Sequence, residues 1–423
     1  MFDERYSPAS LTETNFFKPL KLTDSITLQH RGALAPVTRV RADDNLVLNQ
    51  QTEYTETIDW KKFIGDQANK TGDQKRGMAE EYYHQRSQRP GTLIITEATF
   101  ISPGAGGYEN CPGIYTDAQK DSFAKVANAV HANKSYIFMQ LWNLGRASNP
   151  AVLKKHGLPY ISSSDKYILT GDYLETKKQS EESGNLLRPI TIEEIEQFKK
   201  DYVHATKNAL EAGIDGVELH SANGYLFNQF LDKVCNQRND KYGSQSYENR
   251  SRFLLEVFDL LVEKFGGDKI ALRLSPFGSF GDMAGADDVE ETTAFYSYLL
   301  DEFEKRRAVN KGPVYISLVE PRHDETAGAQ ENKANTDLLI EFVYKHFKGV
   351  IVRAGGILLD AEYTKKVLDT HDRTVIAFGR YFIANPDLID RLEGEHPINK
   401  YDRSTFYTSG FKGYVDYPYY KPE

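Results

Sequence analysis

Three polar side chains follow one predicted strand closely, in the segment HSANGYLFNQFL at residues 220–231. The residues before it, DGVEL at 215–219, are typical of a short buried strand. His220, Asn223 and Tyr225 can all donate hydrogen bonds, and an imidazole or a phenol can also transfer a proton. Because a packed core has no use for such polarity, the segment indicates an active site.

The elements that must position this segment alternate between strand and helix. Strands are predicted at 33–39, 92–100, 135–142, 215–220, 269–276, 313–321, 349–356 and 373–380, and helices at 118–133, 191–213 and 249–265. Eight strands alternating with helices in a chain of 423 residues favour a single-domain α/β fold, a TIM (β/α)8 barrel over residues 1–423. A doubly wound sheet is disfavoured because no G-x-G-x-x-G follows an early strand, and PGAGG at 103–107 is interpreted as a loop.

Three segments fall outside the barrel pattern. Residues 17–31 are predicted to form an N-terminal β-hairpin at the barrel bottom. Residues 43–75, after the first strand, form a polar insertion that either covers the active-site face or is a solvated loop. Residues 162–188, after the third strand, are Ser-rich and are predicted to be a lid or a hairpin.

Composition excludes several classes of protein. The formal net charge of −9 and a pI near 5.7 argue against nucleic-acid binding. No long apolar run predicts a membrane span, and the N-terminal residues contain no apolar signal region, so a cytoplasmic protein is expected. Cys111 and Cys235 are too few for a disulfide framework or a four-thiolate metal site, and are expected to be reduced, ordinary thiols. No metal is predicted.

Strand alternation predicts which side chains point into the barrel. Apolar residues are assigned to the outer face at Met139, Leu141, Val217, Leu219, Leu272, Leu274, Val350 and Val352. The inner face then carries Gln140, Trp142, Glu218, His220, Arg273 and Arg353, and Thr38 is placed inward together with Leu34 and Pro36. Two arginines and a glutamine in one volume need a partner, which is either an internal pair such as Arg273 with Glu218 or a polar, anionic ligand.

The last two strands end in glycine-containing turns, RAGGI at 353–357 and FGRYF at 378–382. In TIM barrels the loops at these positions often bind phosphate. Arg353 or Arg380 could pair with that phosphate. A planar phosphorylated cofactor, FMN or pyridoxal phosphate, fits these features, and the absence of a lysine at any predicted strand end favours the flavin.

These residues lie in strings that run in one order along the chain, among them PVTRVRA, AGGYEN, QLWNLGR, HSANGYLFNQFL, ALRLSP, VRAGG, FGRYFIANPDL and KYDRSTFYT. In them the chain resembles the Old Yellow Enzymes, and most of all their yeast and fungal branch. The resemblance implies an FMN-dependent NADPH dehydrogenase and ene-reductase that works by ping-pong kinetics on α,β-unsaturated carbonyl compounds. It implies small-molecule enone or phenolic ligands and a monomer or homodimer.

The resemblance also implies a role for individual residues. Thr38, Gln140 and Arg273 would contact the flavin ring, and the phosphate would be held by Arg353, Gly355, Gly356, Gly379 and Arg380. His220 and Asn223 would donate hydrogen bonds to the substrate carbonyl, and Tyr225 would protonate the α-carbon. Trp142 and Phe382 would shape the pocket, with Phe382 standing where many relatives have tyrosine.

Two alternative functions fit these residues less well. A flavoprotein that mainly binds a steroid or phenol is disfavoured by Tyr225, which a pure binder does not need. A flavin-free lyase or aldolase would need a catalytic lysine, and none is evident at the strand ends.

Overall fold

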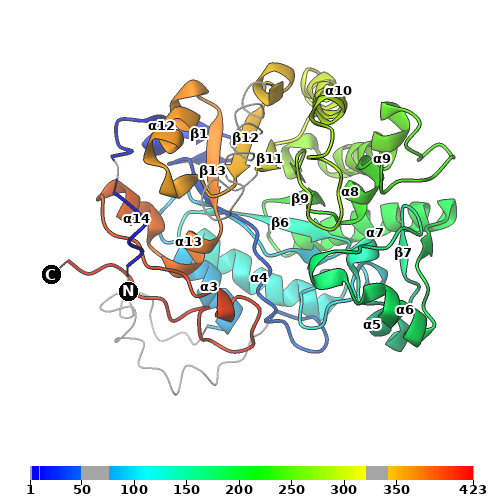
Figure 1. Cartoon of the computed structure of the whole chain (residues 1–423). Helices are drawn as coiled ribbons and strands as arrows, with labels where there is room; N and C mark the ends of the chain where they lie inside the picture. Colours follow the sequence, from blue (N-terminus) through cyan, green and yellow to red (C-terminus); the bar gives the residue numbers. More distant parts are fainter. Residues whose placement is uncertain (1, 9, 49–75, 321–341, 423) are drawn as a thin grey trace.

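The computed structural model describes residues 2–8, 10–48, 76–320 and 342–422. Eight parallel strands close into a barrel, because β13 pairs with β3 and β4 pairs with β6 (Figure 1). This confirms the predicted TIM barrel. The strands are β3 (Gly32–Leu34), β4 (Leu93–Ile95), β6 (Tyr136–Trp142), β9 (Gly216–Ser221), β10 (Ile270–Leu274), β11 (Tyr315–Val319), β12 (Val350–Ala354) and β13 (Thr374–Phe378).

Several strands are shorter than predicted. β3 ends at Leu34 because Pro36 has no backbone N–H with which to extend the ladder. The segment predicted at 92–100 divides into β4 and a short β5 (Thr99–Phe100), which pairs with β6. PGAGG contains a turn of 3-10 helix at Pro103–Ala105.

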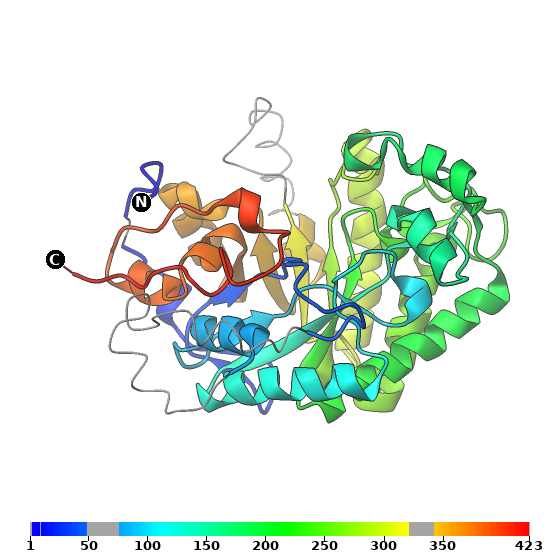
Figure 2. The same ribbon diagram turned by 90° about the horizontal axis from the view of Figure 1, so that it is seen from below.

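Helices surround the barrel (Figures 1 and 2). The longer ones are α3 (Met78–Arg86), α4 (Asp117–Ala132), α7 (Ile192–Glu211), α9 (Tyr247–Phe265), α10 (Val289–Arg307) and α12 (Ala361–Thr370). α7 begins with the capping box that the sequence predicts: Glu194 N–H donates to the Thr191 hydroxyl at 3.2 Å, and Thr191 N–H donates to the Glu194 carboxylate at 2.8 Å. In the described part of the chain, no helix has the length and apolar character needed to cross a membrane.

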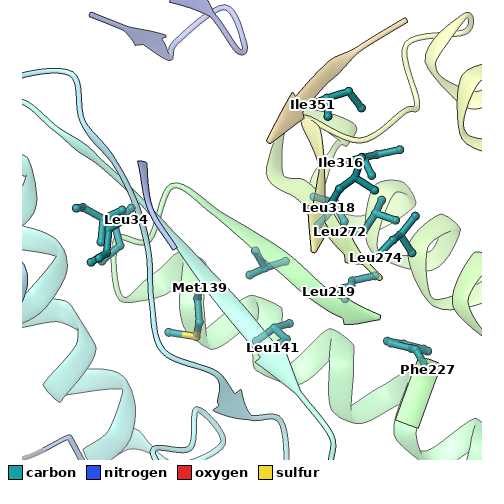
Figure 3. Packing of buried hydrophobic residues seen from close by; sticks show 14 of the residues in the cluster. Leu34, Met139, Leu141, Leu219, Phe227, Leu272, Leu274, Ile316, Leu318 and Ile351 are labelled. Carbon is teal, nitrogen blue, oxygen red and sulfur yellow. The ribbon is translucent and has the colours of Figure 1, made fainter. Parts of the chain in front are cut away.

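The hydrophobic core has two layers. The outer layer lies between strands and helices and contains Met139, Leu141, Leu219, Leu272 and Leu274, as predicted (Figure 3). The inner layer fills the barrel and includes Ala33, Leu93, Phe138, Ala271 and Val375, together with Ile26 and Leu28. Leu28 belongs to an antiparallel ribbon of β1 (Leu20–Lys21) and β2 (Thr27–Leu28), so this ribbon closes one end of the barrel.

Two face assignments are wrong. Val350 and Val352 pack in the inner layer, whereas their neighbour Ile351 packs in the outer layer. Leu34 also packs in the outer layer, so the inward face of β3 is the one that carries Ala33 and Ala35. Since β3 ends at Leu34, strand alternation does not extend to Thr38.

The segment after β6 forms a small lobe beside the barrel (Figure 1). It contains α5 (Pro150–Lys155), β7 (Ile161–Ser162), the 3-10 turn η5 (Gly171–Tyr173), α6 (Thr176–Ser183) and β8 (Arg188–Pro189). β7 and β8 pair in parallel, so the segment at 162–188 is a strand–helix–strand connection and not a hairpin. Most of the insertion predicted at 43–75 lies outside the described residues.

Residues 405–413 return to the first barrel strand and are held there by two buried arginines. Arg39 donates to the carbonyls of Phe406 at 3.3 Å and Gly413 at 2.7 Å. Arg41 donates to the carbonyls of Thr405 at 3.0 Å and Gly410 at 2.8 Å. Because both arginines closely follow β3, these bonds fix the segment beside the carboxyl end of that strand.

Candidate active site

The inward side chains of β6, β9 and β10 form the floor of the candidate site. Gln140 lies opposite Glu218, and Arg273 lies opposite His220. Paired residues of parallel strands project from the same face of the sheet, and on these strands that face carries the inner-layer residues Phe138 and Ala271. The Gln140 amide nitrogen donates to the Glu218 carboxylate at 2.7 Å. The structure therefore brings these four polar residues together inside the barrel, as the sequence predicts.

The backbone of the loop after β9 adopts conformations that favour asparagine and glycine. Asn223 and Gly224 both adopt left-handed conformations, with φ of 55° and 73°. A Cβ on Gly224 would lie 2.7 Å from the Phe280 carbonyl oxygen, so a side chain has no room there. Asn223 N–H donates to the Ser275 hydroxyl at 2.9 Å, and Gly224 N–H donates to the Asn228 side chain at 2.8 Å. These bonds fix the loop that presents Tyr225.

Three aromatic rings meet at the carboxyl ends of β6 and β9. The ring centroids of Trp142 and Tyr225 are 4.9 Å apart with an interplanar angle of 87°, and those of His220 and Tyr225 are 4.8 Å apart at 81°. Trp142 also stacks on Phe100 at 5.0 Å. Trp142, His220 and Tyr225 thus lie in mutual contact, as expected for residues of one site.

Both titratable residues of this group are neutral at physiological pH. Burial, and then the positive charge of Arg273, lower the pKa of His220 well below its ordinary value of 6.5. Burial also raises the pKa of Tyr225 well above 10. A neutral imidazole can donate one hydrogen bond, and a neutral phenol retains a proton to give.

Several buried polar atoms of the floor have no hydrogen-bond partner among the described residues. They are Nε1 of Trp142, Nδ1 of His220, Nε of Arg273 and Oε2 of Glu218. Buried polar groups are seldom left unpaired, so these atoms indicate a ligand with hydrogen-bonding edges. Gln140 presents its carbonyl oxygen as a further acceptor, because its amide nitrogen is directed to Glu218. The polar ring system of FMN fits this set of donors and acceptors.

The turns after β12 and β13 are adjacent because these two strands are paired. A Cβ on Gly355 would lie 2.7 Å from the Glu320 Cβ, and one on Gly379 would lie 3.3 Å from a Val37 methyl group. Gly356 has a left-handed φ of 82°. Arg380 is half-buried at the start of α13 (Arg380–Ala384), where one guanidinium nitrogen donates to the Tyr401 hydroxyl at 2.9 Å. These glycine-lined turns and Arg380 fit a phosphate group.

Arg353 does not share this arrangement. Its guanidinium forms a buried ion pair with the Glu320 carboxylate, and both side chains are only 1% exposed. One guanidinium nitrogen also donates to the Tyr363 hydroxyl of α12 at 2.9 Å. The predicted inward orientation of Arg353 is wrong, because Val350 and Val352 occupy the inner face of β12. We therefore do not include Arg353 among the phosphate ligands.

Phe382 is 1% exposed and packs with the hydrophobic residues of the outer layer. Its role in shaping the pocket stays a prediction. Thr38 is half-buried in the segment between β3 and Arg39. The thiols of Cys111 and Cys235 are buried and free.

Tyr108 and Tyr173 belong to the same cluster as Trp142 and Tyr225, yet the sequence did not single them out. Their hydroxyls are 2.7 Å apart. Tyr108 stands in AGGYEN, one of the strings in which the chain resembles the Old Yellow Enzymes, but the sequence assigned no role to this residue. Tyr173 comes from the lobe after β6, where no local pattern points to a site.

A closed parallel barrel with this polar floor, a His–Asn–Tyr loop and glycine-lined turns after its last two strands has the architecture of a flavin-dependent oxidoreductase. Residues 62–399 match the sequence model of the NADH:flavin oxidoreductase / NADH oxidase family, whose members bind FMN. The chain belongs to this family. It is an FMN-dependent oxidoreductase of the Old Yellow Enzyme type, as the sequence predicted, and it takes its electrons from a nicotinamide cofactor.

Known relatives span nearly the whole chain. Enoate reductase 1 of Kluyveromyces lactis is 41% identical over 422 residues, which are 98% of this chain and 96% of the relative. A probable NADPH dehydrogenase of Candida albicans is 40% identical over 414 residues, covering 96% and 91%. The crystal structure of Old Yellow Enzyme from Pichia sp. AKU4542 is 40% identical, covers 98% of this chain and 96% of that one, and superimposes with a TM-score of 0.83. These similarities confirm the yeast and fungal branch.

Proposed function

We propose that the enzyme reduces the activated C=C bond of α,β-unsaturated carbonyl compounds, with NADPH as the reductant. The observation that supports this most directly is the placement of a neutral His220 and a neutral Tyr225 in contact above the polar floor. When bound, FMN supplies the hydride that adds to the β-carbon. The protein must then stabilise negative charge on the carbonyl oxygen and deliver a proton to the α-carbon.

His220 and Asn223 are suited to the first task. Hydride addition places charge on the oxygen, and fixed hydrogen-bond donors directed at that oxygen stabilise it more in the transition state than in the ground state. His220 donates as a neutral imidazole, since its lowered pKa excludes the imidazolium. Asn223 is on a loop whose backbone is fixed by the Ser275 hydroxyl, so its carboxamide is carried on a rigid support.

Tyr225 is suited to the second task. It follows Asn223 in the same loop and packs edge-on against both Trp142 and His220. A proton donor at a position different from that of the oxygen ligands can reach the adjacent carbon. Its raised pKa keeps the phenol protonated throughout the physiological range.

The names of relatives support this class of substrate. One is an enoate reductase, one of Oryza sativa is a 12-oxophytodienoate reductase that is 37% identical over 398 residues, and one matched crystal structure is a morphinone reductase at 32% identity. The second candidate, a protein that mainly binds a steroid or phenol, has no comparable support.

The test uses the purified holoenzyme under anaerobic conditions. NADPH should bleach the flavin absorbance, and 2-cyclohexenone should then restore it with formation of cyclohexanone. Cyclohexanone, which lacks the C=C bond, is the matched control and should leave the flavin reduced. If 2-cyclohexenone also left the flavin reduced, the proposed substrate class would be wrong.

A further inference from the structure

One buried carboxamide joins the loop after β9 to the loop after β6. Gln229 lies in α8 (Leu226–Leu231), which begins directly after Tyr225, and its side chain is fully buried. Its amide nitrogen donates to the carbonyl of Gly224 at 2.7 Å and to the carbonyl of Leu144 at 2.9 Å. The side chain therefore links the peptide just before Tyr225 to the loop that follows the neighbouring barrel strand.

The oxygen of the same carboxamide is fully used as well. It accepts from Arg146 N–H at 3.2 Å and from the Ser162 hydroxyl of β7 at 2.7 Å. A primary amide offers two donors and two acceptor positions, so all four are occupied. Because a peptide N–H can only donate and a peptide carbonyl can only accept, these partners determine which way the amide faces. Gly145 leaves room for the amide, since a Cβ there would collide with the Gln229 oxygen.

The two loops that Gln229 joins also carry aromatic rings of the site. The ring centroids of Trp142 and Tyr225 are 4.9 Å apart. Near this contact, Leu226 N–H donates to the Asn143 carbonyl at 3.0 Å, and Gln229 N–H donates to the Tyr225 carbonyl at 2.9 Å. Gln229 thus holds the backbone on both sides of Tyr225, with its side chain before the residue and its main chain after it.

The other end of the loop, at Asn223, has supports of its own. Asn223 N–H donates to the Ser275 hydroxyl at 2.9 Å, and Gly224 N–H donates to the Asn228 side chain at 2.8 Å. Neither bond involves Gln229. Loss of the Gln229 carboxamide would therefore release the end of the loop that carries the proposed proton donor and leave the Asn223 end in place.

We propose that Gln229 is a positioning residue for the proton-transfer step. It holds the peptide that precedes Tyr225 against the loop after β6, and so fixes the direction in which the phenol presents its proton. This inference rests on the proposed function, because it requires Tyr225 to act as the acid. It assigns to the start of α8 a part in the geometry of the reaction.

The physical need for such a residue comes from Gly224. Its φ of 73° and the closeness of the Phe280 carbonyl oxygen require glycine, which is the residue with the greatest backbone freedom. A flexible residue directly before the acid would let the phenol move, and a displacement of about 1 Å can slow a reaction about 100-fold. The rigidity must then come from bonds to the Gly224 peptide groups, and Gln229 supplies the bond to its carbonyl.

The test compares the two half-reactions of the holoenzyme in a Gln229→Met variant, which keeps the length of the side chain and removes the amide. Oxidation of the reduced flavin by 2-cyclohexenone should be roughly 10- to 100-fold slower. Flavin reduction by NADPH and oxidation by ferricyanide, neither of which takes a proton from Tyr225, should keep their wild-type rates. The Kd of 4-hydroxybenzaldehyde should also stay at its wild-type value, because His220 and Asn223 keep their supports.

A solvent isotope effect separates positioning from a general loss of structure. In the Gln229→Met variant proton transfer should limit the enone step, so its solvent deuterium isotope effect should rise above the wild-type value. Gln85→Met is the matched control. It removes an equally buried amide, which donates to the Val415 carbonyl at 3.1 Å, and should leave both half-reactions and the isotope effect unchanged.

Gln229→Glu provides a conservative variant whose behaviour depends on pH. The protonated carboxyl has nearly the shape of the amide and can donate one hydrogen bond, whereas the carboxylate donates none and faces two carbonyl oxygens. Its enone rate, divided by the wild-type rate at the same pH, should be close to one at low pH and fall as pH rises. The same ratio for Gln229→Met should not change with pH.

Two outcomes would overturn the inference: an enone step within about twofold of wild type in Gln229→Met, or equal losses with 2-cyclohexenone and ferricyanide. If Gln229→Met does not fold, a rate ratio of Gln229→Glu that is independent of pH would overturn it. Failure of the wild-type protein to reduce 2-cyclohexenone would overturn the proposed function as well. Normal wild-type turnover with an unaffected Gln229→Met variant would overturn this inference alone.

Discussion

The ion pair between Arg353 and Glu320 gives a prediction that separates structural stability from cofactor binding. Both side chains are 1% exposed, and Tyr363 donates to the same carboxylate at 3.3 Å. Removing one member of a buried ion pair destabilises a protein by about 3–5 kcal/mol, because the other charge is left buried without compensation. Arg353→Met should therefore lower the free energy of unfolding by about this amount.

The expected change in melting temperature follows from the size of the chain. An unfolding entropy of about 2.1 cal/mol/K per residue, over 423 residues, corresponds to about 0.9 kcal/mol/K. The Arg353→Met variant should thus melt about 3–6 °C below wild type in differential scanning calorimetry of the apoprotein. Tyr363→Phe, which removes only a neutral hydroxyl, should have a smaller effect of about 1 kcal/mol.

A double variant provides the sharper control. Replacing a buried ion pair with apolar residues of similar volume is often neutral or stabilising, so Arg353→Met with Glu320→Leu should recover most of the lost stability. The affinity of the apoprotein for FMN should stay within a few-fold of wild type in each folded variant. An Arg353→Met variant that melts normally but binds FMN more than about tenfold more weakly would show that Arg353 is a phosphate ligand after all.

Three other perturbations follow from the site and its surroundings. Tyr225→Phe should be reduced by NADPH at the wild-type rate but oxidised by 2-cyclohexenone roughly 10²- to 10⁴-fold more slowly in stopped flow, because the proton donor is lost; a near-normal enone rate would exclude Tyr225 as the acid. His220→Ala should raise the Kd of 4-hydroxybenzaldehyde roughly tenfold in a spectral titration, and an unchanged Kd would contradict its role as a donor. Burial raises the pKa of Glu97 from 4.5 to about 7, so the folded protein keeps a proton that the unfolded chain releases, and stability falls as pH rises between those values. Glu97→Gln should therefore melt above wild type at pH 8 and close to it at pH 4.5, and a pH-independent difference would refute this reasoning.

Strand alternation predicted the inward residues of β9 because apolar and polar residues alternate cleanly in that strand. In β6 and β10 it predicted them from one polar residue in each strand, Gln140 and Arg273. It failed in β12, where Val350, Ile351 and Val352 are all apolar, so that their order does not indicate which of them faces the barrel interior. There the inner face is decided by packing against the other strands, and the resulting outer position of Arg353 is satisfied by Glu320. A carboxylate that is 33 positions away cannot be read from a local pattern.

The loop that carries His220, Asn223 and Tyr225, and the glycine-containing turns after β12 and β13, could be found from the sequence because each is a short, contiguous string. Tyr173 could not, since its partner Tyr108 is 65 residues away and comes from another loop. Asp282, after β10, binds Leu169 and Thr170 and so helps to hold the lobe that carries Tyr173 against the barrel. Sequence reasoning thus found residues that share a strand end, and missed a residue that tertiary packing brings to the site.

The arginines that follow β3 also bear on how the protein is made. Arg39 and Arg41 bind carbonyls that follow them by 364 to 374 residues. At about 5–20 residues per second of synthesis, the two guanidinium groups remain without these distant partners for roughly 20–75 seconds. The mouth of the barrel beside Thr38 is therefore completed late, and a nascent chain that stalls before residue 405 would expose two arginines and an unfinished site to the quality-control machinery of the cell.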